Sequence, residues 1–173
     1  MNRILQRDAS TLRKKAKEVA KKDIGTPRLN KIIAELKRAM GAQDDGVAIA
    51  APQLGYSLRL FVVSGKVEKI IRAKERREYS DRVFINPRIT KRSKKTEEME
   101  EGCLSVRYLY GKVRRSTKVT IEALDENGKK ITRGASGLLA QVFQHETDHL
   151  NGVLFTDKAV GLRELPPEKR THK

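Results

Sequence analysis

The clearest hydrophobic periodicity lies in the first quarter of the chain. Five apolar residues recur there at the spacing of one helix face: Leu29, Ile32, Ile33, Leu36 and Met40. Thr26 can cap the start of this helix, Pro27 suits its first position, and Gly41 follows the last apolar residue. The pattern therefore predicts a core helix over residues 27–41. A weaker pattern at residues 12–20 hints at a second, basic helix.

A further helical pattern begins after Ser136, a candidate N-cap, and ends at Asn151-Gly152. Its apolar positions are Leu138, Leu139, Val142, Phe143 and Leu150. They predict an amphipathic helix near the C-terminus, with one face buried in the core.

Strand signals lie between the two main helices. Residues 58–63 and 83–86 are short apolar runs, and Pro87 is expected to stop the second. Residues 118–124 alternate apolar with polar positions, Asp125 to Gly128 form a turn, and 129–133 return as a strand. Residues 65–82 are charged and poorly periodic, which indicates a basic surface insertion with some helix. This order of elements predicts an α+β fold.

Length and composition favour a single compact domain spanning residues 1–173, ending in a short tail at 160–173. The lone cysteine excludes an intramolecular disulfide and suits a reducing compartment. No apolar run approaches the ~20 residues that cross a bilayer, and the N-terminus lacks a secretion signal. We therefore expect a cytoplasmic protein without a membrane partner, while an organellar origin stays open.

The most informative motif is His-Glu-Thr-Asp-His at residues 145–149. Positions i and i+4 of a helix lie about 40° apart around its axis and about 6 Å apart along it. His145 and His149 can therefore bind one metal ion from a single face, and Glu146 can reach a water molecule on that ion. The motif indicates metal-assisted hydrolysis.

The third metal ligand stays open on spacing alone, although catalytic metal sites usually have three protein ligands. Asp157, Glu164 and His172 follow the motif, but none has a distinctive context. Upstream, Cys103 lies in EGCLS, residues 101–105. A thiolate is a strong ligand for iron or zinc, whereas a lone cysteine is more often a buried apolar side chain.

Three segments, in this order, resemble the motifs of the peptide deformylases: GVAIAAPQLG at 46–55, EGCLS at 101–105 and QHETDHLNG at 144–152. Flanking sequences agree, namely ILQ near the start, LRKKAK at 12–17 and FINP at 84–87. The resemblance weakens in 65–82 and after about residue 160. It implies antiparallel strands packed around a C-terminal metal-binding helix, with a core helix in the N-terminal half.

The resemblance also implies roles for individual residues. The implied metal ligands are Cys103, His145 and His149. Glu146 is implied as the general base, with the Gln53 side chain and the Leu104 N–H as donors to the developing oxyanion. The implied reaction removes the formyl group from the initiator methionine, as metal-bound hydroxide attacks the formyl carbon and formate leaves. One divalent ion is expected per chain, with Fe²⁺ favoured and Zn²⁺, Ni²⁺ or Co²⁺ able to replace it.

Further residues are candidates for substrate contact and for support of the ligands. Those expected at the substrate are Val47, Ala48, Leu138, Val142 and Tyr110, and core packing is the alternative for Val47, Leu138 and Val142. Asp148 cannot share the ligand face, so it is expected to pair with the basic run at 112–115. The resemblance favours Arg115 as the partner, and this pair would fix the metal helix. Glu101 is expected to support the ligands in the same way, unless it is simply solvated.

The formal net charge of +16 attracts polyanions, and low aromatic content argues against a base-stacking platform. We therefore expect ribosome association through the basic surface, unless the charge only keeps the surface solvated, and no sequence-specific DNA binding. The resemblance implies formyl-methionyl nascent chains as substrates.

The chain departs from the family pattern at four places: Ala48 stands for the usual Gly, Arg107-Tyr108 for Pro-Gly or similar, Thr147 for an apolar residue, and 65–82 is long and basic. These departures affect the expected rate and sequence preference. The alternative functions are a metalloprotease that cuts internal peptide bonds and a non-catalytic, basic ribosome-associated protein.

Overall fold

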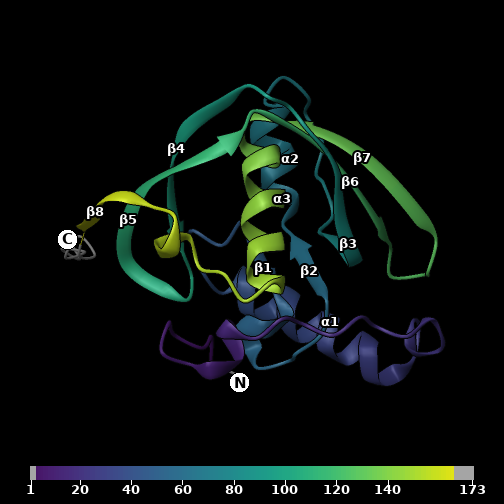
Figure 1. Ribbon diagram of the computed structural model, residues 1–173. Coiled ribbons are helices and arrows are strands. Elements are labelled where there is room, and N and C mark those ends of the chain that lie inside the picture. Colours follow the sequence, from purple (N-terminus) through teal and green to yellow (C-terminus); the bar gives the residue numbers. More distant parts are fainter. Residues whose placement is uncertain (1–2, 166–173) are drawn as a thin grey trace, which may run out of the picture.

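Two antiparallel sheets flank the helix α3, Gly137–Leu150, in the computed structural model, which describes residues 3–165 (Figure 1). The larger sheet has the strand order β1-β2-β3-β6-β7, and the smaller has the order β4-β5-β8. The strands are β1 Ala48–Ala50, β2 Leu60–Val63, β3 Arg82–Arg92, β4 Thr96–Cys103, β5 Val106–Ser116, β6 Lys118–Leu124, β7 Lys130–Ser136 and β8 Val160–Glu164. The expected α+β fold with antiparallel strands around a C-terminal helix is confirmed.

Two further α-helices and four short 3₁₀ helices complete the described part of the chain. They are η1 Ser10–Arg13, η2 Lys21–Asp23, α1 Pro27–Gly41, η3 Ala51–Leu54, α2 Gly65–Ile71 and η4 Phe155–Asp157. Among residues 3–165, no helix combines the length and the apolar character that crossing a membrane requires.

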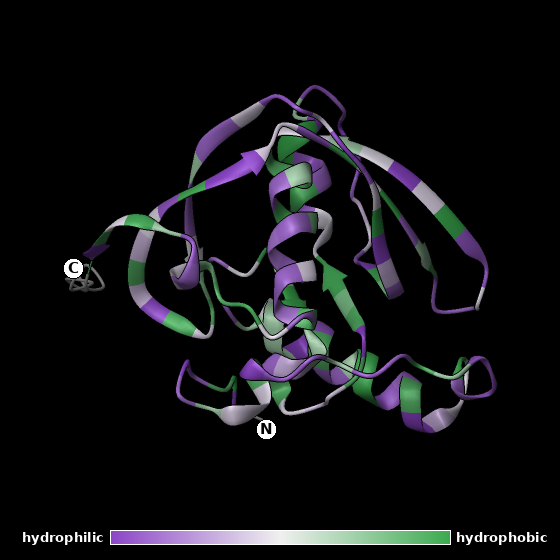
Figure 2. Ribbon diagram, viewed as in Figure 1, coloured by the Kyte–Doolittle hydropathy of each residue, from purple (hydrophilic) through white to green (hydrophobic). Residues whose placement is uncertain are grey.

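Helix α1 confirms the first sequence prediction. Its N-cap is Thr26, whose Oγ1 accepts a hydrogen bond from the Leu29 N–H at 3.3 Å, and Pro27 occupies the first turn. The five apolar residues of the predicted face are all buried, packed against β2 and neighbouring elements. Figure 2 shows the resulting alternation of hydrophobic and hydrophilic residues along α1.

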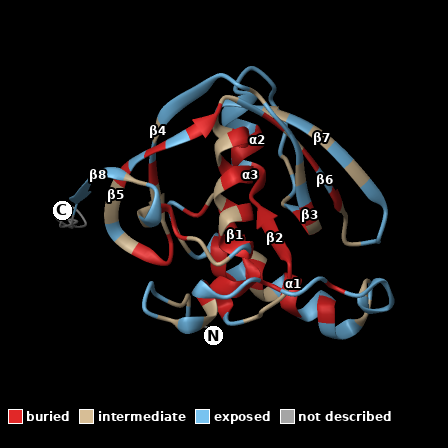
Figure 3. Ribbon diagram, viewed as in Figure 1, coloured by how far each residue is buried: buried red, intermediate tan, exposed pale blue. Residues whose placement is uncertain are grey.

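Helix α3 packs on the larger sheet through an aromatic cluster. The Phe143 ring lies 5.0 Å from the Phe84 ring, which is also 5.0 Å from the Phe61 ring. All three side chains are buried. In Figure 3, β2 is buried along its length, whereas β7, at the edge of the sheet, alternates between exposed and intermediate positions. Ser136 precedes α3 as predicted, but its side chain makes no capping hydrogen bond.

Pro87 does not end β3, contrary to the sequence prediction. The pairing of β3 with β6 shifts register between Ile85 and Arg88, and Asn86 adopts a left-handed φ of 52°. A bulge at this point accommodates a residue without an N–H, so the ladder resumes at Arg88. The Asn86 side chain stabilises the bulge by bonding the backbone N–H and C=O of Val19 at 2.8 and 2.9 Å.

Residues 12–20 do not form the weak helix that their pattern hints at. After η1 the chain runs extended, and its backbone bonds to distant segments. The Ala16 N–H donates to Leu150 O at 2.9 Å, and the Lys17 N–H donates to Ser57 O at 3.0 Å. Tertiary partners therefore replace the hydrogen bonds that a helix would supply.

Two segments that were expected to lie on the surface each begin with a regular element, a helix in one and a strand in the other. Residues 65–71 form α2, whose Val67 is buried, so this part of the 65–82 segment is helical and contributes to the core. Residues 160–164, expected within a short tail, form β8, which pairs with β5 from Lys112 to Leu109. Val160 and Leu162 alternate along β8, but all five of its residues are exposed, so the strand has no buried face. Residues 166–173, the rest of that tail, lie outside the described residues.

Candidate active site

Three side chains that can bind a metal meet between the smaller sheet and α3. Cys103 ends β4, where the chain turns back into β5, and both histidines project from α3. Cys103 Sγ lies 3.2 Å from His149 Nε2, and the ligand atoms of Cys103, His145 and His149 all lie within 4.8 Å of one another. A single cation can therefore contact one sulfur and two imidazoles.

The chemistry of this group suits a divalent metal. Burial opposes ionisation of Cys103, but His149 and His145 outweigh it and lower the pKa of the thiol to about 5. The Ser105 N–H also points at the sulfur, at 3.4 Å. A thiolate with two imidazoles is a donor set that iron and zinc accept.

A buried ion-pair network lies directly behind the ligands. Arg115 Nε and Nη2 donate to both oxygens of Glu101 at 2.7 and 2.9 Å, and its Nη1 donates to Asp148 at 2.6 Å. Glu101 Oε2 lies 2.9 Å from His145 Nδ1. On the outer side, Lys158 donates to both oxygens of Asp148 at 2.8 Å. The network thus joins β4 and β5 to the metal helix and fixes one imidazole.

The network controls the ionisation of Glu101. Burial alone would raise the pKa of this carboxyl, but hydrogen bonds from Arg115 and His145 lower its pKa to about 2. Glu101 is therefore an anion at neutral pH, and His145 Nδ1 is the donor in their contact, which leaves Nε2 for a metal.

Glu146 has a different environment from Glu101, although both carboxyls are buried. Among the described residues no group bonds Glu146 Oε2, and burial raises the pKa of this carboxyl to about 7. A carboxyl with this pKa can both accept and release a proton near neutrality.

Gln53 is held so that its amide nitrogen faces the thiol. Its Oε1 accepts the Ala50 N–H at 2.8 Å, and its Nε2 donates to Ser105 Oγ at 3.0 Å and lies 3.8 Å from Cys103 Sγ. Leu104 follows Cys103 in the β4–β5 turn, and Gln6 Nε2 donates to its carbonyl oxygen at 3.2 Å. Gln53 and Leu104 thus place a side-chain amide and a backbone segment beside the three side chains that can bind a metal.

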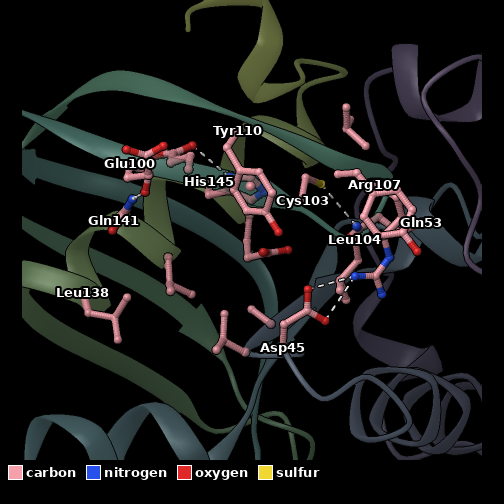
Figure 4. Close-up of a pocket in the computed structure, with 18 residues that line it drawn as sticks. Asp45, Gln53, Glu100, Cys103, Leu104, Arg107, Tyr110, Leu138, Gln141 and His145 are labelled. Carbon is pink, nitrogen blue, oxygen red and sulfur yellow. Dashed lines mark hydrogen bonds and ion pairs between the residues drawn. The ribbon is translucent and has the colours of Figure 1, made fainter. Parts of the chain in front are cut away.

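A cavity of about 260 Å³ opens beside these groups. Its lining includes Cys103, His145, Glu146, Gln53 and Leu104 (Figure 4). The five residues expected at the substrate, namely Val47, Ala48, Leu138, Val142 and Tyr110, also line it. The structure therefore brings together all the catalytic and substrate candidates from three distant segments of the chain.

Gly102 explains how Tyr110 reaches the cavity wall. A Cβ atom at Gly102 would lie 2.6 Å from the Tyr110 ring. The glycine of EGCLS is thus required for the close packing of this ring across the β4–β5 hairpin.

The other possible third ligands lie elsewhere or were not described. Asp157 pairs with Arg13 at 2.6 Å and accepts the Leu154 N–H, and Glu164 is exposed on β8. His172 lies outside the described residues.

Several residues at the site carried no recognised signal in the sequence. Ser105 lies within EGCLS, yet its bond to Gln53 requires two segments to meet. Lys158 lies in no recognisable motif. It reaches Asp148 of α3 because the chain turns at η4, directly before Lys158. The cavity is also lined by residues to which the sequence gave no role: Asp45, Glu100, Val106 and Gln141.

Comparisons with known proteins agree with this geometry. A family model described as Polypeptide deformylase matches residues 1–164. Peptide deformylase 2 of Clostridium acetobutylicum is 41% identical over 146 residues, which are 84% of this chain and 87% of that protein. A Met-Ala-Ser-bound class I type b peptide deformylase from Acinetobacter baumannii has a TM-score of 0.78 and 30% identity, over 90% of this chain and 97% of that one. An actinonin complex of a peptide deformylase from Synechococcus elongatus has a TM-score of 0.77 and 34% identity, over 91% of this chain and 78% of that one.

The buried network predicts a large difference between two neighbouring arginines. Arg115 is buried against two carboxylates, whereas Arg114 pairs with Glu98 at 3.5 Å and its side chain is 71% exposed. Arg115→Leu should lower the free energy of unfolding by about 3–5 kcal/mol, because it leaves buried carboxylates unpaired. Arg114→Leu should change it by less than about 1 kcal/mol. Denaturant unfolding of both metal-free variants measures this, and equal losses would contradict it.

Proposed function

Because the chain belongs to the polypeptide deformylase family and is an enzyme that removes the N-formyl group from newly made chains, we propose which of its residues perform that reaction. The observation that carries the proposal is the convergence of Cys103, His145 and His149 beside Glu146 and Gln53. Neither a protease that cuts internal bonds nor a non-catalytic protein is favoured by the family match.

Cys103, His145 and His149 hold one divalent metal in this proposal. When bound, the metal supplies Lewis acidity and lowers the pKa of water. Arg115 and Asp148 act by positioning, since Arg115 joins Asp148 of the metal helix to Glu101. Glu101 in turn fixes the ring of His145.

Glu146 moves the proton. Its carboxylate, which lines the cavity, accepts a proton from the attacking water. A C–O bond then forms at the formyl carbon. Glu146 returns the proton to the amine nitrogen as the C–N bond breaks, so the products are formate and a free α-amine.

Gln53 and Leu104 stabilise the oxygen that becomes negative. The Gln53 amide is oriented by Ala50 and Ser105, which places its Nε2 3.8 Å from Cys103 Sγ, where the metal would bind. The Leu104 N–H is the second donor. Donors fixed before the reaction cost little reorganisation, and losing one typically costs about 2.7–4 kcal/mol.

The methionine side chain occupies the apolar part of the cavity, formed by Val47, Leu138 and Val142. An unbranched apolar side chain fits a slot of this kind beside the reacting carbon. Tyr110 and Ala48 line the same cavity and contact the substrate next to it. The Met-Ala-Ser peptide bound by the structural relative from Acinetobacter baumannii supports a methionine-led ligand.

Substitution of Glu146 tests the proposed function directly. Glu146→Gln should lower kcat/KM on a formyl-Met peptide by about 10²–10⁴-fold, because it removes the proton acceptor, and should leave bound metal unchanged. The control is Glu97→Gln, at an exposed position of β4, which should leave kcat/KM and the bound metal unchanged. The wild-type protein should not act on the acetyl-Met peptide. Full activity of Glu146→Gln would refute the assignment.

We propose Fe²⁺ as the native metal, because a thiolate with two imidazoles accepts it. A thiolate on ferrous iron is open to oxidation, so the iron-loaded protein should lose activity in air. The measurement is to remove metal with a chelator, reload with Fe²⁺ or Zn²⁺ without oxygen, and follow turnover after exposure to air. Loss in the iron form alone is expected, and air-stable iron-loaded activity would contradict this metal assignment.

We propose a cytoplasmic protein that approaches the ribosome through basic surface. Five exposed lysines and arginines of two surface segments make no ion pair within residues 3–165: Lys14, Lys15, Lys66, Lys74 and Arg76. Neutralising Lys66, Lys74 and Arg76 should weaken co-sedimentation with ribosomes at low salt and reduce its salt dependence. Neutralising Lys31, Lys129 and Lys130 is the control with the same net charge. If the two triple variants co-sediment with ribosomes equally, the surface around Lys66, Lys74 and Arg76 is not the one that contacts the ribosome.

A further inference from the structure

A second hollow, of about 530 Å³, adjoins the active-site cavity. The two share the wall residues Leu104, Arg107 and Tyr108. The rest of the second hollow is lined by Arg3, Ile4, Gln6, Ala39, Ala42 and Gln43. The N-terminal segment and the end of α1 therefore form a surface that continues from the site where the formyl group is removed.

The shared rim is held in place by an ion pair. Arg107 Nη1 donates to both oxygens of Asp45 at 2.8 and 3.1 Å (Figure 4). Its Nη2 donates to Gln43. The next residue, Tyr108, has a left-handed φ of 63°, and about half of it is exposed. Arg107 is thus fixed at the point where the cavity meets the second hollow.

The sign of the charged side chains changes across this rim. Asp45 and Glu100 line the active-site cavity near its edge. Arg3 and Arg107 are the charged side chains that line the second hollow, among residues 3–165. Arg3 has no ion-pair partner in that range, so the hollow carries a positive charge that Asp45 does not neutralise.

We infer that the second hollow receives the third to fifth residues of the nascent chain and favours acidic side chains there. The inference rests on the proposed function, because it requires the formylated end to lie in the adjoining cavity. An extended chain advances about 3.3–3.6 Å per residue, so the residues that leave the cavity past Leu104 and Arg107 come next to the hollow. Its occupant is then a continuation of the substrate rather than a separate ligand.

Net charge alone cannot produce the same preference. The excess of +16 attracts an acidic peptide wherever its carboxylate lies. A local site favours acidic side chains only at the positions that reach Arg3 and Arg107, and not at the second residue, which lies nearer Asp45.

The experiment measures kcat/KM on formyl-Met-Ala and on a formyl-Met-Ala-Ala-Ala-Ala amide series with Asp or Lys at one position from 2 to 5. At low salt, Asp should exceed Lys by about two- to five-fold at one or more of positions 3–5. No such preference is expected at position 2. At high salt the ratio should approach one, because these groups are near the surface.

Three variants identify the charge responsible. Arg3→Gln should bring the ratio of kcat/KM for the Asp peptide to that for the Lys peptide toward one. Ala42→Glu should reduce this ratio further, because it adds a carboxylate to the hollow. Arg28→Gln removes the same charge at the other end of α1, about 20 Å away, and should leave the ratio unchanged.

The possible results separate this inference from the proposed function. Failure to deformylate formyl-Met-Ala would overturn the proposed function. Turnover of that peptide with equal ratios at all positions, or an equal fall in Arg3→Gln and Arg28→Gln, would overturn the second hollow as an acidic-residue site. A preference confined to positions 3–5 that only the hollow variants change is the expected result.

Discussion

The contact of Arg115 with Glu101 and Asp148 is the constraint on which the rest of the site depends. It joins the β4–β5 hairpin to α3, which follows much later in the sequence. Glu101 precedes Cys103 by two residues and contacts His145, so the position of one guanidinium is transmitted to candidate ligands on both the hairpin and the helix. A buried arginine is costly to desolvate, and here three charge-assisted hydrogen bonds offset that cost.

The same network explains why neighbouring acidic side chains differ in their protonation states. Glu101, Cys103 and Glu146 are close together and largely buried, yet their pKa values are about 2, about 5 and about 7. Glu101 has an arginine and an imidazole as donors, and Cys103 has two imidazoles. Glu146 has one oxygen that nothing bonds among residues 3–165. Environment therefore separates the ionisation of three acidic groups within one site, as the proposed roles of an anchoring anion, a metal ligand and a proton carrier require.

Local patterns predicted what depends on neighbours in sequence. Helix α1 has its cap, its proline and its buried face within fifteen residues, and the two histidines share a face because helix geometry requires it. The β4–β5 hairpin was missed because glutamates make up half of β4 and because apolar and polar residues alternate little along β5. The course of residues 14–19 was missed because their backbone partners, Ser57, Asn86 and Leu150, are distant in sequence. Motif resemblance implied that Cys103 meets His145 and His149, a long-range convergence that the structure shows, but it gave no role to Ser105 or Lys158.

Net charge is a poor guide to the field inside the active-site cavity. The chain has an excess of sixteen positive charges, yet the cavity is lined by Asp45, Glu100, Glu101 and Glu146, and Arg107 is the only lysine or arginine among the lining residues within 3–165. Screening confines exposed charges to a range of about 8 Å at physiological salt, so the basic surface acts on approaching polyanions and little on the ligands. A thiolate beside buried carboxyls is costly unless positive charge compensates it. Arg115 compensates Glu101, and the remaining negative charge lies at Cys103, where the two imidazoles converge. A divalent cation at that point would balance the negative charge of the thiolate. The negative charge of the cavity lining and the presence of metal-binding side chains are therefore linked.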